Sequence, residues 1–84
     1  MNFTVVYRPS ATQQIAQLWN DAPDRAAVTA AANALDADLR KDPFARSESR
    51  GGNRRIKVEF PLAVYYDVSH ADCLVTVHAV WRVA

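Results

Sequence analysis

The chain has 84 residues, one cysteine, a formal net charge of +1 and a hydrophobic content of 50%. These values are typical of one globular domain over residues 1–84 and exclude a disordered chain. The lone cysteine excludes an internal disulfide and a zinc ribbon, and no apolar run approaches the roughly 20 residues that span a bilayer. The first residues do not resemble a secretory signal, so we expect a cytoplasmic protein that makes no membrane contact. We also expect no cofactor and no bound metal in so small a domain.

The basic residues are concentrated in one segment. Between Arg40 and Lys57 there are seven basic and two acidic residues, whereas the rest of the chain has three basic and seven acidic ones. Such a segment indicates a local site for an anion, either a nucleic-acid backbone or an acidic partner. The alternative is a solvated loop whose charges keep the protein in solution.

The N-terminal half predicts one strand and two helices. Residues 3–8 are β-branched and aromatic and predict a strand. A first helix is expected to start at Ser10, a residue type that caps helix N-termini. An apolar stripe at helical spacing over residues 28–39 predicts a second helix, capped by Asp21 and ended before Pro43. Because a short turn joins the two helices, we expect a hairpin that buries both of its apolar stripes together.

The C-terminal half predicts β-structure after a loop at residues 44–53. Three segments of apolar or alternating pattern follow, at residues 55–60, 62–68 and 74–83. Short turns separate these segments, so the three strands should pair antiparallel. We therefore predict an α+β fold with an N-terminal strand, a helical hairpin and a three-stranded antiparallel meander. The helices should pack on one face of the sheet and leave the other face open.

Basic side chains are expected to line the open face. Arg55 and Lys57 occupy the polar side of their strand, and His78 and Arg82 occupy the polar side of the last strand. The same alternation places Trp81 on the apolar side, toward the helices. A row of cations on a rigid sheet can hold phosphate groups in fixed positions. We therefore expect Arg55, Lys57 and Arg82 to converge on the uncovered side of the sheet.

The pattern of these segments resembles the RelE/ParE superfamily of toxins from bacterial type II toxin–antitoxin systems, of the plasmid stabilisation type. The resemblance covers nearly the whole chain and is carried by RRIKVEFPLAVYYDV (54–68) and LVTVHAVWR (74–82). It implies a toxin that a cognate antitoxin protein neutralises. RelE-like members are endoribonucleases that enter the ribosome, cleave mRNA and inhibit translation. The alternatives are a ParE-like inhibitor of DNA gyrase and a catalytically inert member that only binds an antitoxin.

The resemblance also implies a set of site residues. Arg55 and Lys57 match the two basic positions of the family's second strand. Arg82 lies at, or one position from, the basic residue that ends the family's last strand. His78 is added as a general acid or base beside them. The expected catalytic residues are Arg55, Lys57, Arg82 and His78.

Other positions qualify the enzyme assignment. Ala63 stands where RNA-cleaving members carry an arginine, and no tyrosine follows Arg82 to stack on the substrate base, so an endoribonuclease activity stays open. One of the tyrosines at positions 65 and 66 is expected to stack on a base if it faces the open side. Arg50 and Arg54 flank a Gly-Gly pair and are expected RNA-binding residues, with a solvated loop as the alternative.

The expected partners follow from the same resemblance. They are a small acidic or amphipathic antitoxin, together with the ribosome and mRNA, or DNA gyrase in the alternative. The antitoxin should cover the basic face and an edge of the sheet. The sequence leaves two assemblies open, a homodimer and a toxin–antitoxin hetero-oligomer.

Overall fold

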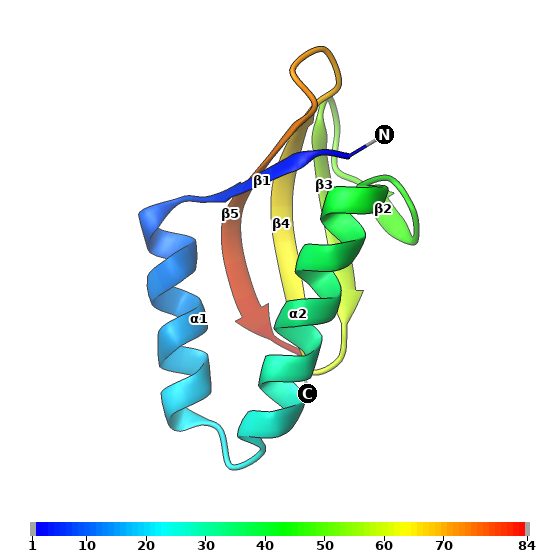
Figure 1. Cartoon of the computed structure of the whole chain (residues 1–84). Helices are drawn as coiled ribbons and strands as arrows, with labels where there is room; N and C mark the ends of the chain where they lie inside the picture. Colours follow the sequence, from blue (N-terminus) through cyan, green and yellow to red (C-terminus); the bar gives the residue numbers. More distant parts are fainter. Residues whose placement is uncertain (1, 84) are drawn as a thin grey trace.

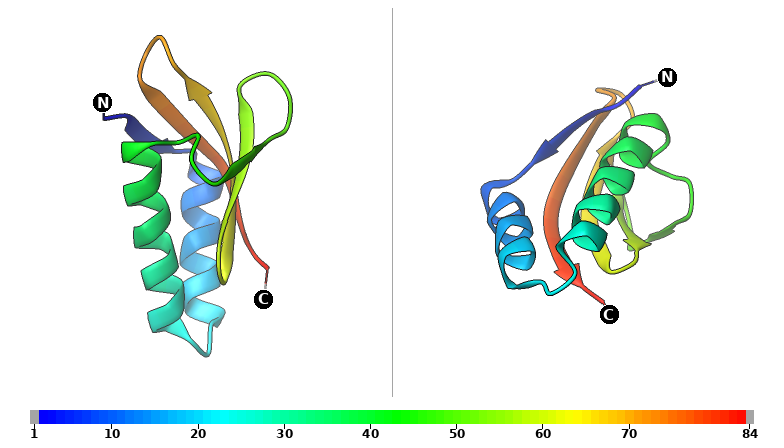
Figure 2. Two further views of the ribbon diagram at one scale, coloured as in Figure 1. Left: turned by 90° about the vertical axis from the view of Figure 1, so that its right-hand side faces the viewer. Right: turned by 60° about the horizontal axis from the view of Figure 1, so that its bottom comes forward.

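The computed structural model describes residues 2–83, which form two helices and a five-stranded mixed sheet. The elements in chain order are β1 (Thr4–Tyr7), α1 (Pro9–Asp21), α2 (Arg25–Lys41), β2 (Ser47–Ser49), β3 (Arg54–Glu59), β4 (Leu62–Ser69) and β5 (Leu74–Arg82). The strand order across the sheet is β1-β5-β4-β3-β2, with β1 parallel to β5 and the other neighbours antiparallel. Both helices lie on one face of the sheet (Figure 1 and Figure 2). We call the opposite side the open face.

The predicted α+β fold is confirmed in outline and corrected in detail. The helical hairpin and the meander of β3, β4 and β5 agree with the expectation. The sheet has five strands instead of four because residues 47–49, expected in a loop, pair with β3 as an edge strand. α1 begins at Pro9 instead of Ser10, since the missing N–H of proline costs little in a first turn. α1 continues through Asp21, so Asp24 is the residue that precedes α2.

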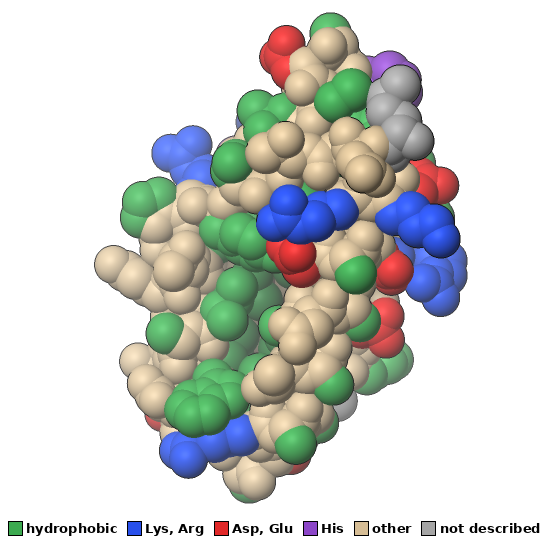
Figure 3. All heavy atoms as spheres, in the orientation of Figure 1, with side chains coloured by type: hydrophobic (Ala, Val, Ile, Leu, Met, Phe, Trp, Pro, Cys, Tyr) green, Lys and Arg blue, Asp and Glu red, His purple; other side chains and the backbone are tan. Residues whose placement is uncertain are grey.

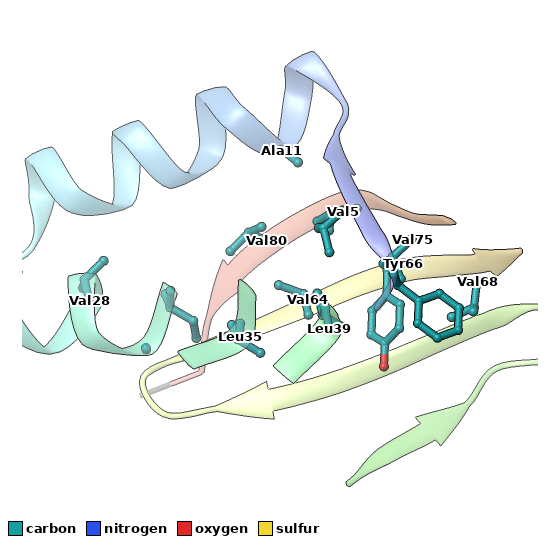
Figure 4. Close-up of a cluster of buried hydrophobic side chains, with 14 residues drawn as sticks. Val5, Ala11, Val28, Leu35, Leu39, Val64, Tyr66, Val68, Val75 and Val80 are labelled. Carbon is teal, nitrogen blue, oxygen red and sulfur yellow. The ribbon is translucent and has the colours of Figure 1, made fainter. Parts of the chain in front are cut away.

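The core lies between the helices and the sheet (Figure 4). The apolar stripe predicted over residues 28–39 is confirmed, because α2 buries four of its side chains there. Replacing one of the larger ones, such as Leu35, by alanine would cost about 2–5 kcal/mol. The side chains that meet in the core include Val5, Ala11, Val28, Leu35, Leu39, Val64, Tyr66, Val68, Val75 and Val80.

The outer side of the helical hairpin has a hydrophobic hollow between α1 and α2 (Figure 3). Ile15 and Val28 line this hollow from the two helices. Trp19 lies at its edge with 42% of its surface exposed, and its indole Nε1 donates a hydrogen bond to Thr29 Oγ1 at 3.1 Å. No helix among the described residues combines the length and the apolar character needed to cross a bilayer.

A β-bulge in β5 changes which side chains face the core. The register shifts between Tyr65 and Tyr66, where β5 has one residue more than β4, His78. An extra residue of this kind moves the following side chains to the opposite face of the sheet. As a result Val80 is buried in the core and Trp81 faces the open side with 37% of its surface exposed. The prediction that Trp81 points toward the helices is therefore wrong, because strict alternation ends at the bulge.

Candidate functional site

Lys57 lies on the helix side of the sheet. Its side chain is 2% exposed, and Nζ donates a hydrogen bond to the Ala45 carbonyl oxygen at 2.9 Å. Nζ also lies 3.7 Å from Asp38 Oδ2 of α2. The strand register explains this position, because Lys57 is paired with Val64, whose side chain is in the core. A buried ammonium group needs such partners, since an unpaired one would be strongly destabilising.

Arg55 lies on the same side, next to the connection between α2 and β2. It is paired with Tyr66, another core residue. Its Nε donates to Ser47 Oγ at 2.7 Å, and its guanidinium carbon lies 5.4 Å from the ring centroid of Phe44. Arg55 is therefore engaged in holding this connection and points away from the open face.

Three sheet side chains together fix the segment 43–47. Each of them donates a hydrogen bond to an alternate residue of the segment: Tyr66 to Pro43, Lys57 to Ala45 and Arg55 to Ser47. The shortest of the three joins Tyr66 Oη to the Pro43 carbonyl oxygen at 2.6 Å, and burial raises the pKa of this phenol. We call Arg55, Lys57 and Tyr66 the clamp. Tyr66 and Lys57 donate to backbone carbonyl oxygens, and Arg55 Nη2 also donates to the Ser47 carbonyl oxygen at 3.3 Å, so the clamp satisfies backbone acceptors along this segment.

Arg82 is separate from the clamp, at the other end of the helix side. Two hydrogen bonds, of 3.0 and 2.8 Å, join its guanidinium to the carboxylate of Asp24 in the α1–α2 turn. These bonds hold the pKa of Asp24 below its ordinary value. The expected convergence of Arg55, Lys57 and Arg82 on the open face is therefore wrong.

The physical reason lies in the alternation of β3. Its apolar residues Ile56 and Val58 face the open side, where Val58 is 46% exposed, and its basic residues face the helices. An alternating pattern separates the two sides of a strand, but it does not tell which side the helices cover. The polar side of β3 is the covered one because Lys57 finds its partners there.

His78 does lie on the open face, in a group of polar and aromatic side chains. Its Nε2 is 2.6 Å from Asp67 Oδ2, and its ring centroid is 5.9 Å from that of Tyr65. Arg54 Nε lies 3.7 Å from the other carboxylate oxygen of Asp67. All three charged or imidazole side chains remain partly exposed, at 27% for His78, 37% for Asp67 and 63% for Arg54. We call Arg54, Tyr65, Asp67 and His78 the open-face cluster.

The open-face cluster has the groups needed for proton transfer next to a phosphate. A carboxylate that accepts the N–H of one imidazole nitrogen fixes the tautomer and leaves the other nitrogen as a proton acceptor. Here Asp67 contacts Nε2 of His78, and the tautomer that carries its proton on Nε2 leaves Nδ1 as the proton acceptor. A neighbouring guanidinium can bind a phosphate oxygen with two N–H groups.

A groove of about 710 Å³ opens beside the open-face cluster. The turn at Gly51 and Gly52 forms one wall, and both glycines have positive φ, 96° and 57°, a region that favours this residue. Arg50 and Arg54 line the groove together with Asp67. Arg50 also pairs with a neighbouring carboxylate, Glu48, at 2.7 Å. The two arginines expected to bind RNA are thus side by side, and their role in RNA binding stays a prediction.

Asp67 is the member of the open-face cluster that sequence reasoning missed. The tight hairpin around residues 70–73 places Asp67 opposite Thr76, and the bulge then brings His78 beside it. The sequence predicts this hairpin, so counting residue pairs outward from its turn would have placed Asp67 opposite the start of the last strand. Nothing in the amino-acid pattern indicates the bulge itself.

Comparison with known proteins shows the fold. No protein-family model matches the sequence, and no curated protein matches it. Among the solved structures that match is a chain from the crystal structure of the toxin–antitoxin complex RelBE2 of Mycobacterium tuberculosis. The TM-score is 0.78 with 15% sequence identity, over 98% of this chain and 99% of that chain. The two chains therefore share one fold over nearly their whole lengths.

Proposed function

We propose that this chain is the toxin of a type II toxin–antitoxin pair and that it stops translation by cleaving mRNA. The fold shared with a chain of a toxin–antitoxin complex supports the toxin–antitoxin role and a cognate antitoxin as partner. The observation that carries the reaction is the contact of His78 with Asp67, at 2.6 Å on the open face. Arg54 beside this contact supplies the cation that a phosphate substrate needs.

The proposed reaction is an attack of a ribose 2′-hydroxyl on the adjacent phosphate. His78 accepts the hydroxyl proton at Nδ1 while the 2′-oxygen bonds to phosphorus. The bond from phosphorus to the 5′-oxygen breaks, and this oxygen takes up a proton from solvent water to leave as a 5′-hydroxyl, while the other product ends in a 2′,3′-cyclic phosphate. Arg54 offsets the negative charge that develops on the phosphoryl oxygens. Asp67 acts as a positioning residue that holds the imidazole tautomer.

In this proposal the basic residues on the helix side have supporting roles. Arg55 and Lys57 hold the segment 43–47, which places β2 against β3. Arg82 holds the end of β5 to the helical hairpin through Asp24. The reaction is assigned to the open-face cluster because its side chains are the ones a substrate on the open face can reach.

The test is induced expression of the wild-type chain and of His78→Gln in bacterial cells. Protein synthesis, the 5′ ends of mRNA and DNA damage are measured in parallel, with and without a co-expressed antitoxin. We expect the wild-type chain to stop protein synthesis and produce new mRNA ends, and the antitoxin to reverse this. His78→Gln should reduce cleavage by about 10²- to 10⁴-fold, the usual contribution of a general base.

The matched control is His70→Gln, because His70 is the other histidine of the chain and lies in the β4–β5 turn. This variant should cleave mRNA like the wild type. If His78→Gln accumulates to the same level and remains equally toxic, the proposed reaction is wrong. DNA damage with intact mRNA would instead assign a binding mode such as gyrase inhibition.

A further inference from the structure

The helical hairpin has an outer face that carries no charge in its middle. Residues 9–20 and 26–35 contain no Asp, Glu, Lys or Arg, although 23% of the residues in the whole chain are charged. Figure 3 views this face and shows green and tan atoms across its middle, with blue and red atoms toward the ends and margins of the hairpin. A helix that meets water on its outer side usually carries charged residues there. Depletion of charge is instead typical of the centre of a protein interface.

The uncharged face is also hollowed between the two helices. The hollow has a volume of about 440 Å³, and Ile15, Ala16 and Val28 are among the residues that line it. Trp19 stands at its edge, 42% exposed, and its hydrogen bond to Thr29 crosses from α1 to α2. A tryptophan held in this way is a large and rigid contact, and tryptophan is enriched at protein interfaces. A partner with a raised, uncharged helix surface would fill the hollow and cover Trp19.

The two ends of α1 carry opposite charges, each of the sign that the helix itself disfavours. Arg8 directly precedes the helix, and Asp21 is its last residue. The helix dipole favours a negative charge at the N-terminal end and a positive charge at the C-terminal end, so both residues are placed against it. Asp21 accepts a hydrogen bond from a neutral group, the Gln17 amide, at 2.8 Å. A second helix with the same end charges, antiparallel to α1, would bring the opposite charge to each end.

A second copy of this chain has the properties that such a partner needs. Its α1 presents the same uncharged middle, and in an antiparallel arrangement the Asp21 end of each copy meets the Arg8 end of the other. A two-fold axis repeats each contact, as in most homodimers. An acidic antitoxin would instead bring carboxylates to a face that offers no cation in its middle.

The size of the face indicates how strong the contact is. α2 has 17 residues and is therefore about 26 Å long, and two adjacent helices are about 22 Å wide. The hairpin thus offers roughly 550 Å² per copy. Stable interfaces start at about 600 Å² per partner. We therefore expect a dimer that dissociates on dilution instead of a permanent one.

We propose that two copies of this chain associate through their helical hairpins, with the two α1 helices antiparallel and each Trp19 covered by the other copy. The two-fold axis passes close to Ala16, an exposed residue near the middle of α1. Because both helices lie on one face of the sheet, the two open faces point outward and remain accessible (Figure 2). The dimer is therefore compatible with the proposed function and does not depend on it.

Sedimentation velocity of the purified chain measures the association directly. Between about 1 µM and about 1 mM, a range that brackets weak dissociation constants, the average mass should rise from 9.3 kDa toward twice this value. The chain has two tryptophans, so Trp81→Phe leaves Trp19 as the fluorescent one. Its emission should shift to shorter wavelength over the same range of concentration, because the dimer removes its exposed surface from water.

Ala16→Glu places a charge at the two-fold axis, where it meets the same charge of the other copy. This variant should weaken association by at least about 10-fold, since like charges in contact are costly in an interface. Glutamate is a good helix former and Ala16 is exposed, so the urea midpoint should stay unchanged. The matched control is Ala71→Glu, which adds the same charge in the β4–β5 turn. It should associate like the wild type.

Exchange of the end charges tests the antiparallel arrangement. Arg8→Glu and Asp21→Arg each set like charges together twice in the dimer, and each should weaken association by about 3- to 10-fold. The double variant should restore the wild-type association. Both substitutions agree with the helix dipole, so neither is expected to destabilise the fold of a single copy.

Three results would overturn the inference. They are a mass that stays at the monomer value throughout, an Ala16→Glu protein that associates like the wild type, and a double charge variant that associates no better than the single ones. A monomeric wild-type chain whose Trp19 emission shifts only with a co-purified antitoxin would also overturn it, and would assign this face to the antitoxin. None of these measurements uses toxicity, so their outcome and that of the His78→Gln test remain separate.

Discussion

Lys57 Nζ and the carbonyl oxygen of Ala45 lie 2.9 Å apart in the interior, so a lysine on β3 fixes the chain that leaves α2. This contact explains why a basic residue can alternate with apolar ones on a strand and still be covered. The ammonium group replaces its lost water with a backbone acceptor and with the Asp38 carboxylate at 3.7 Å. We therefore expect Lys57 to affect stability more than any reaction on the open face.

Substitution of Lys57 tests this view. Lys57→Met keeps the length of the side chain and leaves the Ala45 carbonyl oxygen without its donor, so it should lower the free energy of unfolding by about 1–3 kcal/mol. Urea denaturation measures the change. Arg54→Met is the matched control on the same strand and the opposite face, and it should stay within about 0.5 kcal/mol of the wild type. A Lys57→Met protein of unchanged stability that no longer cleaves mRNA would make Lys57 catalytic instead.

The adjacent tyrosines of β4 allow a second matched comparison. Tyr66→Phe removes the 2.6 Å hydrogen bond to the buried Pro43 carbonyl oxygen and should cost about 1–3 kcal/mol. Tyr65→Phe, on the open face, should change the stability much less. Hydrogen exchange of the β2 amides should speed up in Tyr66→Phe, since the clamp that positions segment 43–47 is weakened. Equal protection of β2 in both variants would show that the clamp does not hold this strand.

The order of elements was predictable because the core of this fold is built from regular patterns. The apolar stripe over residues 28–39 has the period of a helix, which predicts the second helix of the hairpin. The apolar runs at 62–68 and 74–83 are separated by a short turn, which predicts antiparallel strands of a meander. The segment 47–49 has no strand pattern of its own. It becomes β2 because Arg55 and Lys57 hold the preceding residues against the sheet.

The candidate site was predictable only in part, for two physical reasons. The side of β3 that the helices cover depends on tertiary contacts, here those of Lys57 with Asp38 and Ala45, which an alternating pattern does not contain. The face of Trp81 depends on a bulge at His78, which shifts all later residues by one. The prediction that His78 lies on the open face nevertheless agrees with the structure. The bulged residue points to the same side of the sheet as Asp67, which it contacts.

The contact of Arg82 with Asp24 should be visible in the titration of the Asp24 carboxyl. Hydrogen bonds from Arg82 hold the pKa of Asp24 below its ordinary value. A lowered carboxyl pKa means that the contact stabilises the fold above the unfolded pKa, about 3.9, and is lost as the pH falls through the folded pKa. In Arg82→Gln, NMR should show the Asp24 pKa rising toward its ordinary value. RNA binding at the open face should stay unchanged, and a loss of RNA binding would return Arg82 to the site.

Tyr7 should make the fold sensitive to alkaline pH. Burial raises the pKa of its phenol, and the hydrogen bond that it donates to Asp36 at 2.8 Å raises it further. The folded chain therefore holds this proton more tightly than the unfolded chain. The resulting stabilisation is present below the unfolded pKa of about 10 and is lost as the pH rises from there toward the higher folded value.

Tyr7→Phe tests this dependence, because phenylalanine cannot ionise. The variant should lose about 1 kcal/mol near neutral pH with its hydrogen bond, and its stability should fall less steeply than that of the wild type between about pH 9 and pH 11. Urea midpoints across this range provide the measurement. Adding Tyr66→Phe should flatten the slope again, since burial raises the pKa of Tyr66 too. If the wild type and Tyr7→Phe lose stability in parallel above pH 9, Tyr7 does not carry the alkaline sensitivity, and its contact with Asp36 contributes to packing alone.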